Sequence, residues 1–228
     1  MPVRVSRSRG RLSGDYTPGL VATDTREEFE ELFSLYAPVL VAAAAIVILV
    51  VLFALVRFRR GRGHAPWRRS EATIVEIVYA LGLIGIVAVL VAATFAAEGR
   101  IDRVAAQSGL EVNVTAFKWG WRFDYPGAGV SVAGDDRGPP TAAVPTGATI
   151  HFSLRSRDVI HALWIPDLRF KRDAFPKFAN EFDLVFARAG PYVGRCAEFC
   201  GLRHAGMSFK IDAMARDDFE RWLEERAS

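Results

Sequence analysis

The sequence predicts an α+β protein, in which an N-terminal hairpin of two transmembrane helices precedes an all-β sandwich. Three observations lead to this fold class. Two long apolar runs without any charged residue occupy positions 32–56 and 77–97. From about residue 100 the chain changes to short segments of alternating apolar residues that are separated by turn residues, which is typical of a β-domain. The last third of the chain gathers both cysteines, a histidine and a methionine in one short segment, Cys196–Met207.

The two apolar runs account for the composition of the chain. Hydrophobic residues make up 51% of the 228 residues and the mean hydropathy is +0.16, although 24% of the residues are charged. A helix of about 20 apolar residues is long enough to cross the roughly 30 Å hydrocarbon layer of a membrane. We therefore interpret both runs as membrane spans; buried valine-rich strands are the alternative interpretation.

The charges around the spans predict the topology. The expected divisions are a polar N-terminal segment (1–31), the transmembrane hairpin (32–99) with a cytoplasmic loop at 57–72, and an extracytoplasmic domain (100–228). The loop holds six arginines before its first acidic residue, whereas residues 1–31 carry five arginines and six acidic residues. Because basic residues near the spans favour the cytoplasmic side, both termini and the β-domain are expected on the outer side of a bacterial plasma membrane. No apolar segment before residue 32 resembles a cleavable signal peptide.

The β-domain shows a repeated strand pattern. One strand is expected at Leu110–Phe117, and the following stretch to residue 125 alternates apolar and polar residues as a strand does. Further strands are expected near 148–154, 159–165, 180–187 and 206–213, with an exposed loop at 134–140. The polar C-terminal segment from Arg216 predicts an amphipathic helix that groups Phe219, Trp222 and Leu223.

The Cys196–Met207 segment predicts a metal centre. Cys196, Cys200, His204 and Met207, with His161 upstream, offer thiolates, imidazoles and a thioether, the soft ligands that select copper. This set exceeds the two histidines, one cysteine and weak axial ligand of a single blue-copper ion. It suits two coppers that share both thiolates as bridges and take one imidazole each.

Three other readings of the same residues stay open. Two cysteines four positions apart could form a disulfide in an oxidising compartment, but this would leave the histidines and Met207 unexplained. A zinc site with two cysteines and two histidines usually pairs its histidines within one short motif, whereas His161 and His204 lie in separate segments. A chance cluster without metal is the third.

The segment resembles the binuclear CuA loop of cytochrome c oxidase subunit II, Cys-x-Glu-x-Cys-Gly-x-x-His-x-x-Met, at every defined position. The resemblance extends from about residue 30 to about residue 215. It implies a cupredoxin-like sandwich and the copper ligands His161, Cys196, Cys200, His204, Met207 and the backbone carbonyl of Glu198. It also implies that the Glu198 carboxylate binds a magnesium or manganese ion shared with subunit I.

The resemblance implies roles for two further residues. Trp119 opens a stretch similar to the family's Trp-x-Trp-x-Phe/Tyr-x-Tyr, whose first tryptophan receives electrons from the donor; a core tryptophan is the alternative. Glu76 resembles the glutamate of Glu-x-x-Trp-Thr-x-x-Pro, at the entrance of a proton path, although Tyr79, Ala80 and Leu83 replace the other motif residues. The alternative for Glu76 is a helix-end carboxylate that reaches the headgroup water.

The resemblance thus predicts subunit II of a haem-copper cytochrome c oxidase. Such a subunit takes electrons from soluble or membrane-bound cytochrome c at CuA and passes them to haem in subunit I, for dioxygen reduction coupled to proton translocation. Expected partners are subunit I, other oxidase subunits and membrane lipid, but no nucleic acid. The alternatives are a copper-bearing subunit of a nitric oxide reductase and a membrane-anchored copper scaffold. A quinol oxidase subunit shares the fold but lacks the copper ligands.

Overall fold

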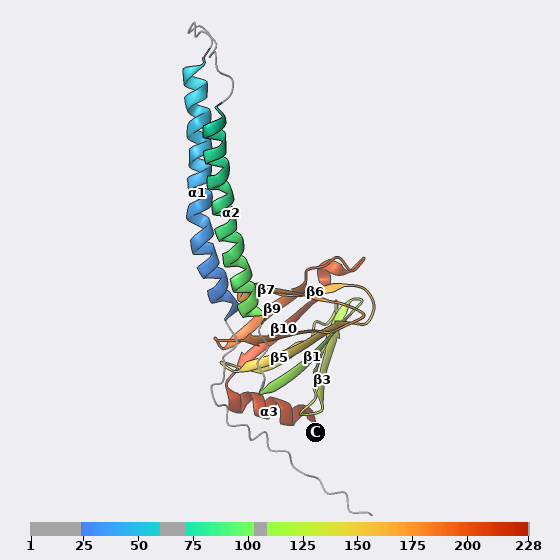
Figure 1. Ribbon diagram of the computed structural model, residues 1–228. Coiled ribbons are helices and arrows are strands. Elements are labelled where there is room, and N and C mark those ends of the chain that lie inside the picture. The colour runs from blue at the N-terminus through green and yellow to red at the C-terminus, as the bar shows by residue number, and fades with distance from the viewer. Residues whose placement is uncertain (1–23, 60–71, 103–108, 228) are drawn as a thin grey trace, which may run out of the picture. The chain divides into compact units, whose positions relative to one another are not determined.

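The computed structural model describes residues 24–59, 72–102 and 109–227 (Figure 1). These residues form two compact units, Thr25–Asp102 and the chain from residue 109 onward. Each unit is treated by itself below. The predicted N-terminal tail, residues 1–23, and most of the predicted cytoplasmic loop, residues 60–71, lie outside the described residues.

The first unit consists of two long helices, α1 (Thr25–Arg57) and α2 (Thr73–Ile101), which run side by side in Figure 1. By length and composition both can cross a membrane, since their best windows have a mean hydropathy of 3.4 and 2.7. The two predicted apolar helices are therefore confirmed. Helix α1 begins at Thr25, seven residues before the uncharged run that starts at position 32, because the acidic segment before the run is also helical. Glu27 and Glu28 lie in its first turn, where the positive end of the helix dipole stabilises negatively charged side chains.

Polar side chains join the two helices. The guanidinium of Arg100 donates from Nε and Nη2 to the two carboxylate oxygens of Glu28, at 2.7 and 2.6 Å. Further along, the hydroxyl of Tyr36 donates to the carbonyl of Leu90 at 2.8 Å. Such contacts give the hairpin a defined register, because a polar group in an apolar surrounding is costly unless it has a partner.

The second unit is a sandwich of two five-stranded sheets. The strands of the first sheet are, in spatial order, β3 (Val130–Asp135), β2 (Gly120–Tyr125), β1 (Leu110–Phe117), β5 (Thr149–Ser156) and β8 (Asn180–Val185). Those of the second are β4 (Thr141–Pro145), β10 (Ser208–Met214), β9 (Gly190–Cys196), β6 (His161–Ile165) and β7 (Phe170–Ala174). Strands β1 and β5 are parallel, as are β4 and β10, and all other neighbours are antiparallel. The predicted all-β sandwich is confirmed.

Aromatic residues fill the space between the sheets. The fully buried ones are Trp121, Phe123, Tyr125, Phe152, Phe182, Phe186 and Phe209. The hydroxyl of Tyr125 on β2 donates to the carbonyl of Ala143 on β4 and accepts from its N–H, at 2.8 and 3.0 Å. This residue therefore connects the two sheets, and its buried hydroxyl is satisfied. The predicted amphipathic C-terminal helix is α3 (Arg216–Ala227), which buries Phe219 and Leu223. The Trp222 ring lies 5.4 Å from that of Tyr125.

One expected strand is wrong. The alternating stretch 117–125 is not one strand, because the chain reverses at Lys118 and Trp119 and Phe117 pairs with Gly120 across the β1–β2 hairpin. A glycine is needed at position 120, since a Cβ there would lie 2.9 Å from the Phe117 ring on β1 and 2.2 Å from the carbonyl oxygen of Gly134 on β3. Alternation persists through Tyr125 because β2 still has one buried face, but Trp119 belongs to the turn.

The sequence pattern also missed β3, β4, β7 and β9. Residues 134 and 135 belong to β3, although we expected them in an exposed loop. Strands β3, β4 and β7 lie at the edges of the sheets, where short strands with charged residues such as Lys171 and Asp173 are common. Strand β9 has Gly190, Pro191 and Gly194, which weaken the strand signal.

A histidine on β5 contacts two carboxylates on β8, and these contacts contribute to stability in a pH-dependent way. His151 lies between two carboxylates: Nδ1 is 2.8 Å from Asp183 Oδ1 and Nε2 is 2.7 Å from Glu181 Oε2. Burial is the largest single influence and lowers the pKa of His151. The hydrogen bonds and charges of Asp183 and Glu181 together outweigh it, so the pKa is raised above its usual value.

We therefore expect His151→Gln to destabilise the protein more in mildly acid than in alkaline solution. The stabilisation from a raised pKa is fully present below the unfolded-state pKa of about 6.5 and is lost as the pH rises through the folded-state pKa. Melting temperatures of the full chain in detergent, followed by near-ultraviolet circular dichroism at several pH values, measure this. A difference between wild type and variant that stays constant with pH would contradict it.

Candidate metal centre

The candidate metal centre is built on the loop between β9 and β10, two neighbouring inner strands of the second sheet. The backbone N–H of Cys196, the last residue of β9, donates to the carbonyl of Met207 at 2.9 Å, directly before β10 begins. This bond closes the loop at its base and brings its first and last candidate ligands together. Within the loop, Gly201 has φ +118°, a conformation that favours glycine, and a Cβ there would lie 3.4 Å from the indole of Trp119.

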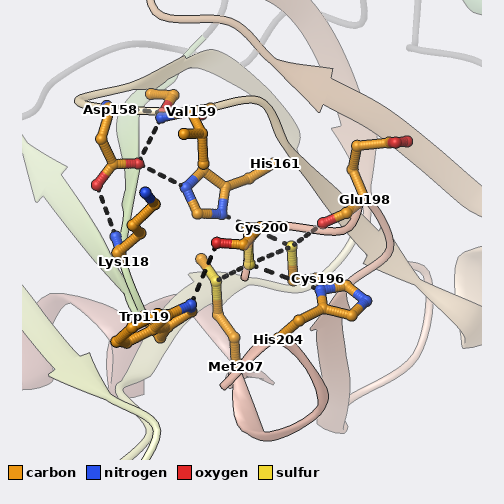
Figure 2. A network of polar contacts seen from close by, with 11 residues as sticks. Lys118, Trp119, Asp158, Val159, His161, Cys196, Glu198, Cys200, His204 and Met207 are labelled. Carbon is orange, nitrogen blue, oxygen red and sulfur yellow. Dashed lines mark hydrogen bonds and ion pairs between the residues drawn. The ribbon is translucent and has the colours of Figure 1, made fainter. Parts of the chain in front are cut away.

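Two thiols lie at the middle of the site (Figure 2). Cys196 and Cys200 are buried and free, and their sulfur atoms are 3.9 Å apart. The backbone carbonyl oxygen of Glu198 lies 3.2 Å from Cys196 Sγ, and Met207 Sδ lies 3.7 Å from Cys200 Sγ. Two thiols, one thioether and one carbonyl thus converge on one small region.

The two histidines face the sulfur atoms from different sides (Figure 2). Nδ1 of His161 is 3.7 Å from Cys196 Sγ, and Nδ1 of His204 is 3.6 Å from Cys200 Sγ. The candidate ligand atoms of His161, Cys196 and Cys200 all lie within 4.8 Å of one another. The structure therefore brings together all five side chains that the sequence singled out as soft ligands.

His161 is oriented by Asp158. The imidazole is fully buried at the start of β6, and its Nε2 lies 2.8 Å from Asp158 Oδ1, which leaves Nδ1 for the sulfur side. Burial, the largest influence, lowers the pKa of His161, but Cys196 and Asp158 raise it by more. Asp158 also accepts the backbone N–H of Lys118 and of Val159, at 2.8 and 2.7 Å. Burial alone would raise the pKa of Asp158, but the hydrogen bond with His161 and the two backbone N–H groups outweigh it, so the pKa is lowered.

The two thiols differ in acidity. Burial favours the neutral thiol of Cys196, but the hydrogen bond with His161 and nearby backbone groups outweigh it and lower its pKa to about 6. Burial and the negative charge of Cys196 raise the pKa of Cys200 to about 12. Because thiolates and not thiols bind metal, a metal that uses both sulfurs must displace a proton from this pair.

The donor set fits copper. It consists of two sulfur atoms, two imidazole nitrogens, a thioether and a carbonyl, whereas a closed zinc site takes four ligands from cysteine and histidine. The carboxylate of Glu198 is directed away from the sulfur atoms in Figure 2, and its Oε2 lies 3.6 Å from Lys171 Nζ. One residue thus presents its carbonyl to the thiols and its half-exposed carboxylate to the other side.

Trp119 contacts the ligand loop directly. Its half-buried indole donates from Nε1 to the carbonyl of Cys200 at 3.3 Å. Trp121, in contrast, is fully buried and packs edge-on against the rings of Phe209 and His161, with centroids 5.1 and 6.4 Å away. The two tryptophans therefore have different surroundings in spite of their spacing in one alternating stretch.

Glu76 belongs to the other unit. It lies in the first turn of α2 and is exposed. Its position and exposure do not bear on a proton path, so this role stays a prediction.

Sequence reasoning assigned no role to Asp158, Arg203 or Asp136. Arg203 lies over the Trp119 ring and forms an ion pair with Asp136. For Asp158 the signal was present, because a carboxylate three residues before a candidate histidine ligand is a common second partner of the imidazole. No local pattern pointed to Asp136, which is distant from Arg203 in the chain.

The chain is similar to proteins of one family. The profile described as "Cytochrome C oxidase subunit II, periplasmic domain" matches residues 138–214. The probable cytochrome c oxidase subunit 2 of Rickettsia bellii is 26% identical over 212 residues, which cover 85% of this chain and 78% of the relative. The cytochrome c oxidase subunit 2 of Alkalihalophilus pseudofirmus is 30% identical over 194 residues, covering 82% of this chain and 55% of the relative.

A solved structure shows the same likeness for the β-domain. It is the crystal structure of the periplasmic domain of subunit II of the cytochrome oxidase of Bradyrhizobium japonicum, with 27% sequence identity and a TM-score of 0.50. The match covers 54% of this chain and 96% of that one.

The geometry predicts that Asp158→Asn weakens copper binding by about 10- to 100-fold, the usual effect of removing an outer partner of a histidine ligand. An amide cannot hold the His161 imidazole as a carboxylate does. Competition titration of the full chain with a copper chelator measures the affinity. Asp167→Asn, a change at an exposed aspartate of the short helix η1 (Pro166–Leu168), is the matched control and should bind as wild type. Equal affinity for both variants would contradict the orienting role.

Proposed function

We propose that the chain is a member of the cytochrome c oxidase subunit II family, a component of an oxidoreductase complex, and that its metal centre is a binuclear CuA site. The observation that carries the proposal is the convergence of Cys196, Cys200, His161, His204 and Met207 on one buried region. When bound there, two coppers supply a one-electron redox centre.

Each residue of the centre has a distinct task in this proposal. The thiolates of Cys196 and Cys200 would hold both copper ions, because sulfur is a soft and strongly donating ligand. The two imidazoles would complete the ligand set, with Met207 and the Glu198 carbonyl as the weaker ligands. The hydrogen bond between His161 Nε2 and the accepting carboxylate of Asp158 keeps Nδ1 of His161 directed at the sulfur atoms. A rigid shell of this kind limits rearrangement when the redox state changes.

The carboxylate of Glu198 is proposed to bind a magnesium or manganese ion at a contact with subunit I. Carboxylate oxygen is the ligand type that these hard cations prefer. The direction of the side chain supports this proposal, because the Glu198 carboxylate points away from the sulfur atoms while the Glu198 backbone carbonyl faces them. Lys171 is the neighbouring charge that such an ion would have to displace.

The proposed setting is a bacterial plasma membrane, with α1 and α2 as membrane spans and the β-domain and both termini on the outer side. The length and apolar composition of the helices and the match to a periplasmic domain support this setting. Subunit I and other oxidase subunits are the proposed partners, with haem in subunit I as the electron acceptor. Dioxygen reduction and coupled proton translocation are assigned to the complex, and Glu76 is proposed to lie at the entrance of a proton path.

Cytochrome c is the proposed donor, and Trp119 is the proposed residue through which its electron reaches the centre. Two observations support Trp119. Its indole is partly exposed, and it forms a hydrogen bond with the carbonyl of Cys200, a residue that would also supply a thiolate. The names of the relatives support an oxidase over a nitric oxide reductase or a copper scaffold.

The site itself is tested by Cys196→Ser and Cys200→Ser. A hydroxyl is a poor ligand for soft copper, and the loss of one thiolate removes a shared ligand from both ions. We expect each variant to lose the two-copper stoichiometry and the mixed-valence optical and paramagnetic spectra. Metal analysis and electron paramagnetic resonance of the purified complex measure both. Cysteine variants that retained two coppers and the mixed-valence spectrum would exclude the CuA assignment.

The donor role is tested by comparing Trp119→Ala with Trp121→Ala. Trp119→Ala should keep copper and fold but slow reduction by cytochrome c, because the indole lies between solvent and the ligand loop. Trp121→Ala removes a fully buried side chain and should destabilise the β-domain by about 3–5 kcal/mol. Stopped-flow reduction kinetics and thermal melts separate the two effects. A Trp119→Ala variant with a normal reduction rate, or one that loses copper and stability as Trp121→Ala does, would assign Trp119 to the core.

A further inference from the structure

Three segments that are distant in the sequence meet at Trp119. The indole lies in the β1–β2 turn, Arg203 in the ligand loop, and Asp136 in the connection from β3 to β4. The guanidinium carbon of Arg203 is 5.8 Å from the centre of the Trp119 ring. Its Nη1 lies 3.2 and 3.3 Å from the two carboxylate oxygens of Asp136.

These contacts place the arginine more firmly than an ordinary surface ion pair. The Asp136 side chain is only 17% exposed. A Cβ built on Gly206 would lie 3.4 Å from the Cβ of Asp136, so the aspartate packs against the ligand loop. A guanidinium is attracted to the face of an indole, and its plane can contact a ring and a carboxylate at the same time. The ammonium of a lysine is a point charge without this geometry.

The arginine and the hydrogen bond to Cys200 act on the same ring. Nε1 of the indole is bound to the carbonyl of Cys200, and Arg203 lies three residues further along the same loop. Gly201 has no side chain, and a Cβ there would lie 3.4 Å from the ring, so this part of the loop packs closely against the indole. Together these contacts fix the indole against the segment that carries the candidate copper ligands.

We propose that Arg203, held by Asp136, is a positioning residue that locks the Trp119 indole onto the carbonyl of Cys200. The inference rests on the proposed function, in which Trp119 receives electrons from the donor. Small displacements of reacting groups lower rates strongly, so a loose indole transfers electrons less efficiently. The electron itself still leaves the reduced donor and arrives at the oxidised centre, without bond or proton changes at Arg203.

The first test follows the indole itself, in the metal-free full chain in lipid nanodiscs with ¹⁵N-labelled tryptophan. The indole N–H resonance of Trp119 is assigned by its absence in Trp119→Phe. In Arg203→Ala and Asp136→Asn we expect exchange of this proton with solvent to become about two- to fivefold faster, as the loss of one exposed cation–π contact implies. Arg216→Ala, which removes an ion-paired surface arginine on α3, is the matched control and should not change it.

The second test measures the bimolecular rate of reduction by cytochrome c in the assembled oxidase. High ionic strength is used because it screens the charge that the substitutions change. Arg203→Ala and Arg203→Lys should both slow reduction about two- to fivefold, in step with the faster indole exchange, while the copper spectrum stays unchanged. Arg216→Ala should reduce at the normal rate.

The proposal would be overturned if the Trp119 indole proton exchanged with solvent in Arg203→Ala as slowly as it does in the wild type. An Arg203→Lys variant with wild-type exchange and rate would also overturn it, because the effect would then belong to the charge alone. Failure of the proposed function looks different. If Trp119→Phe is reduced at the wild-type rate, Trp119 is not on the electron path, although the exchange data would still show whether Arg203 holds the ring.

Discussion

The hydrogen bond between the Cys196 N–H and the Met207 carbonyl is the constraint on which the site depends. It closes the ligand loop in register with β9 and β10, which pair Arg195 with Ser208. Strand β9 is the central strand of its sheet, and β6, which begins at His161, is its other neighbour. The candidate ligands therefore come from the same end of adjacent strands, and a rigid sheet determines their separation.

The other sheet, which contains β1, β2 and β5, contributes the surroundings of the ligands. Its β1–β2 turn supplies Trp119, and the segment after β5 supplies Asp158, which binds both the Lys118 backbone and the His161 ring. One carboxylate therefore connects the turn that holds the proposed electron-receiving residue with a candidate ligand. A functional site is most precise when its residues are held by such outer contacts and rest on rigid elements.

Burial determines the chemistry of the thiols. Both cysteines are buried, and only one of them has an imidazole partner strong enough to lower its pKa. Burial also affects Glu198, whose backbone carbonyl faces the sulfur atoms while its carboxylate stays half exposed beside Lys171. An ionised carboxylate is thus kept away from a buried cluster in which it would need compensation.

Local sequence patterns determined the helices and the identity of the candidate ligands. Uncharged runs at 32–56 and 77–97 are sufficient for two long apolar helices, and a segment as rich in soft ligands as Cys196–Met207 is informative without a structure. The sequence also determined the amphipathic face of α3, because helical periodicity is a local property.

The tertiary structure alone decided the position of Trp119, the strands β3, β4, β7 and β9, and the pairs Asp158–His161 and Arg203–Asp136. Alternation placed Trp119 in a strand, since residues on one face of a strand and residues beyond a tight turn share the same spacing. The contact between Arg203 and Asp136 joins segments that are far apart in the chain, and it forms only once the registers of both sheets are set. Sequence spacing reports local periodicity, whereas such contacts depend on which strands become neighbours.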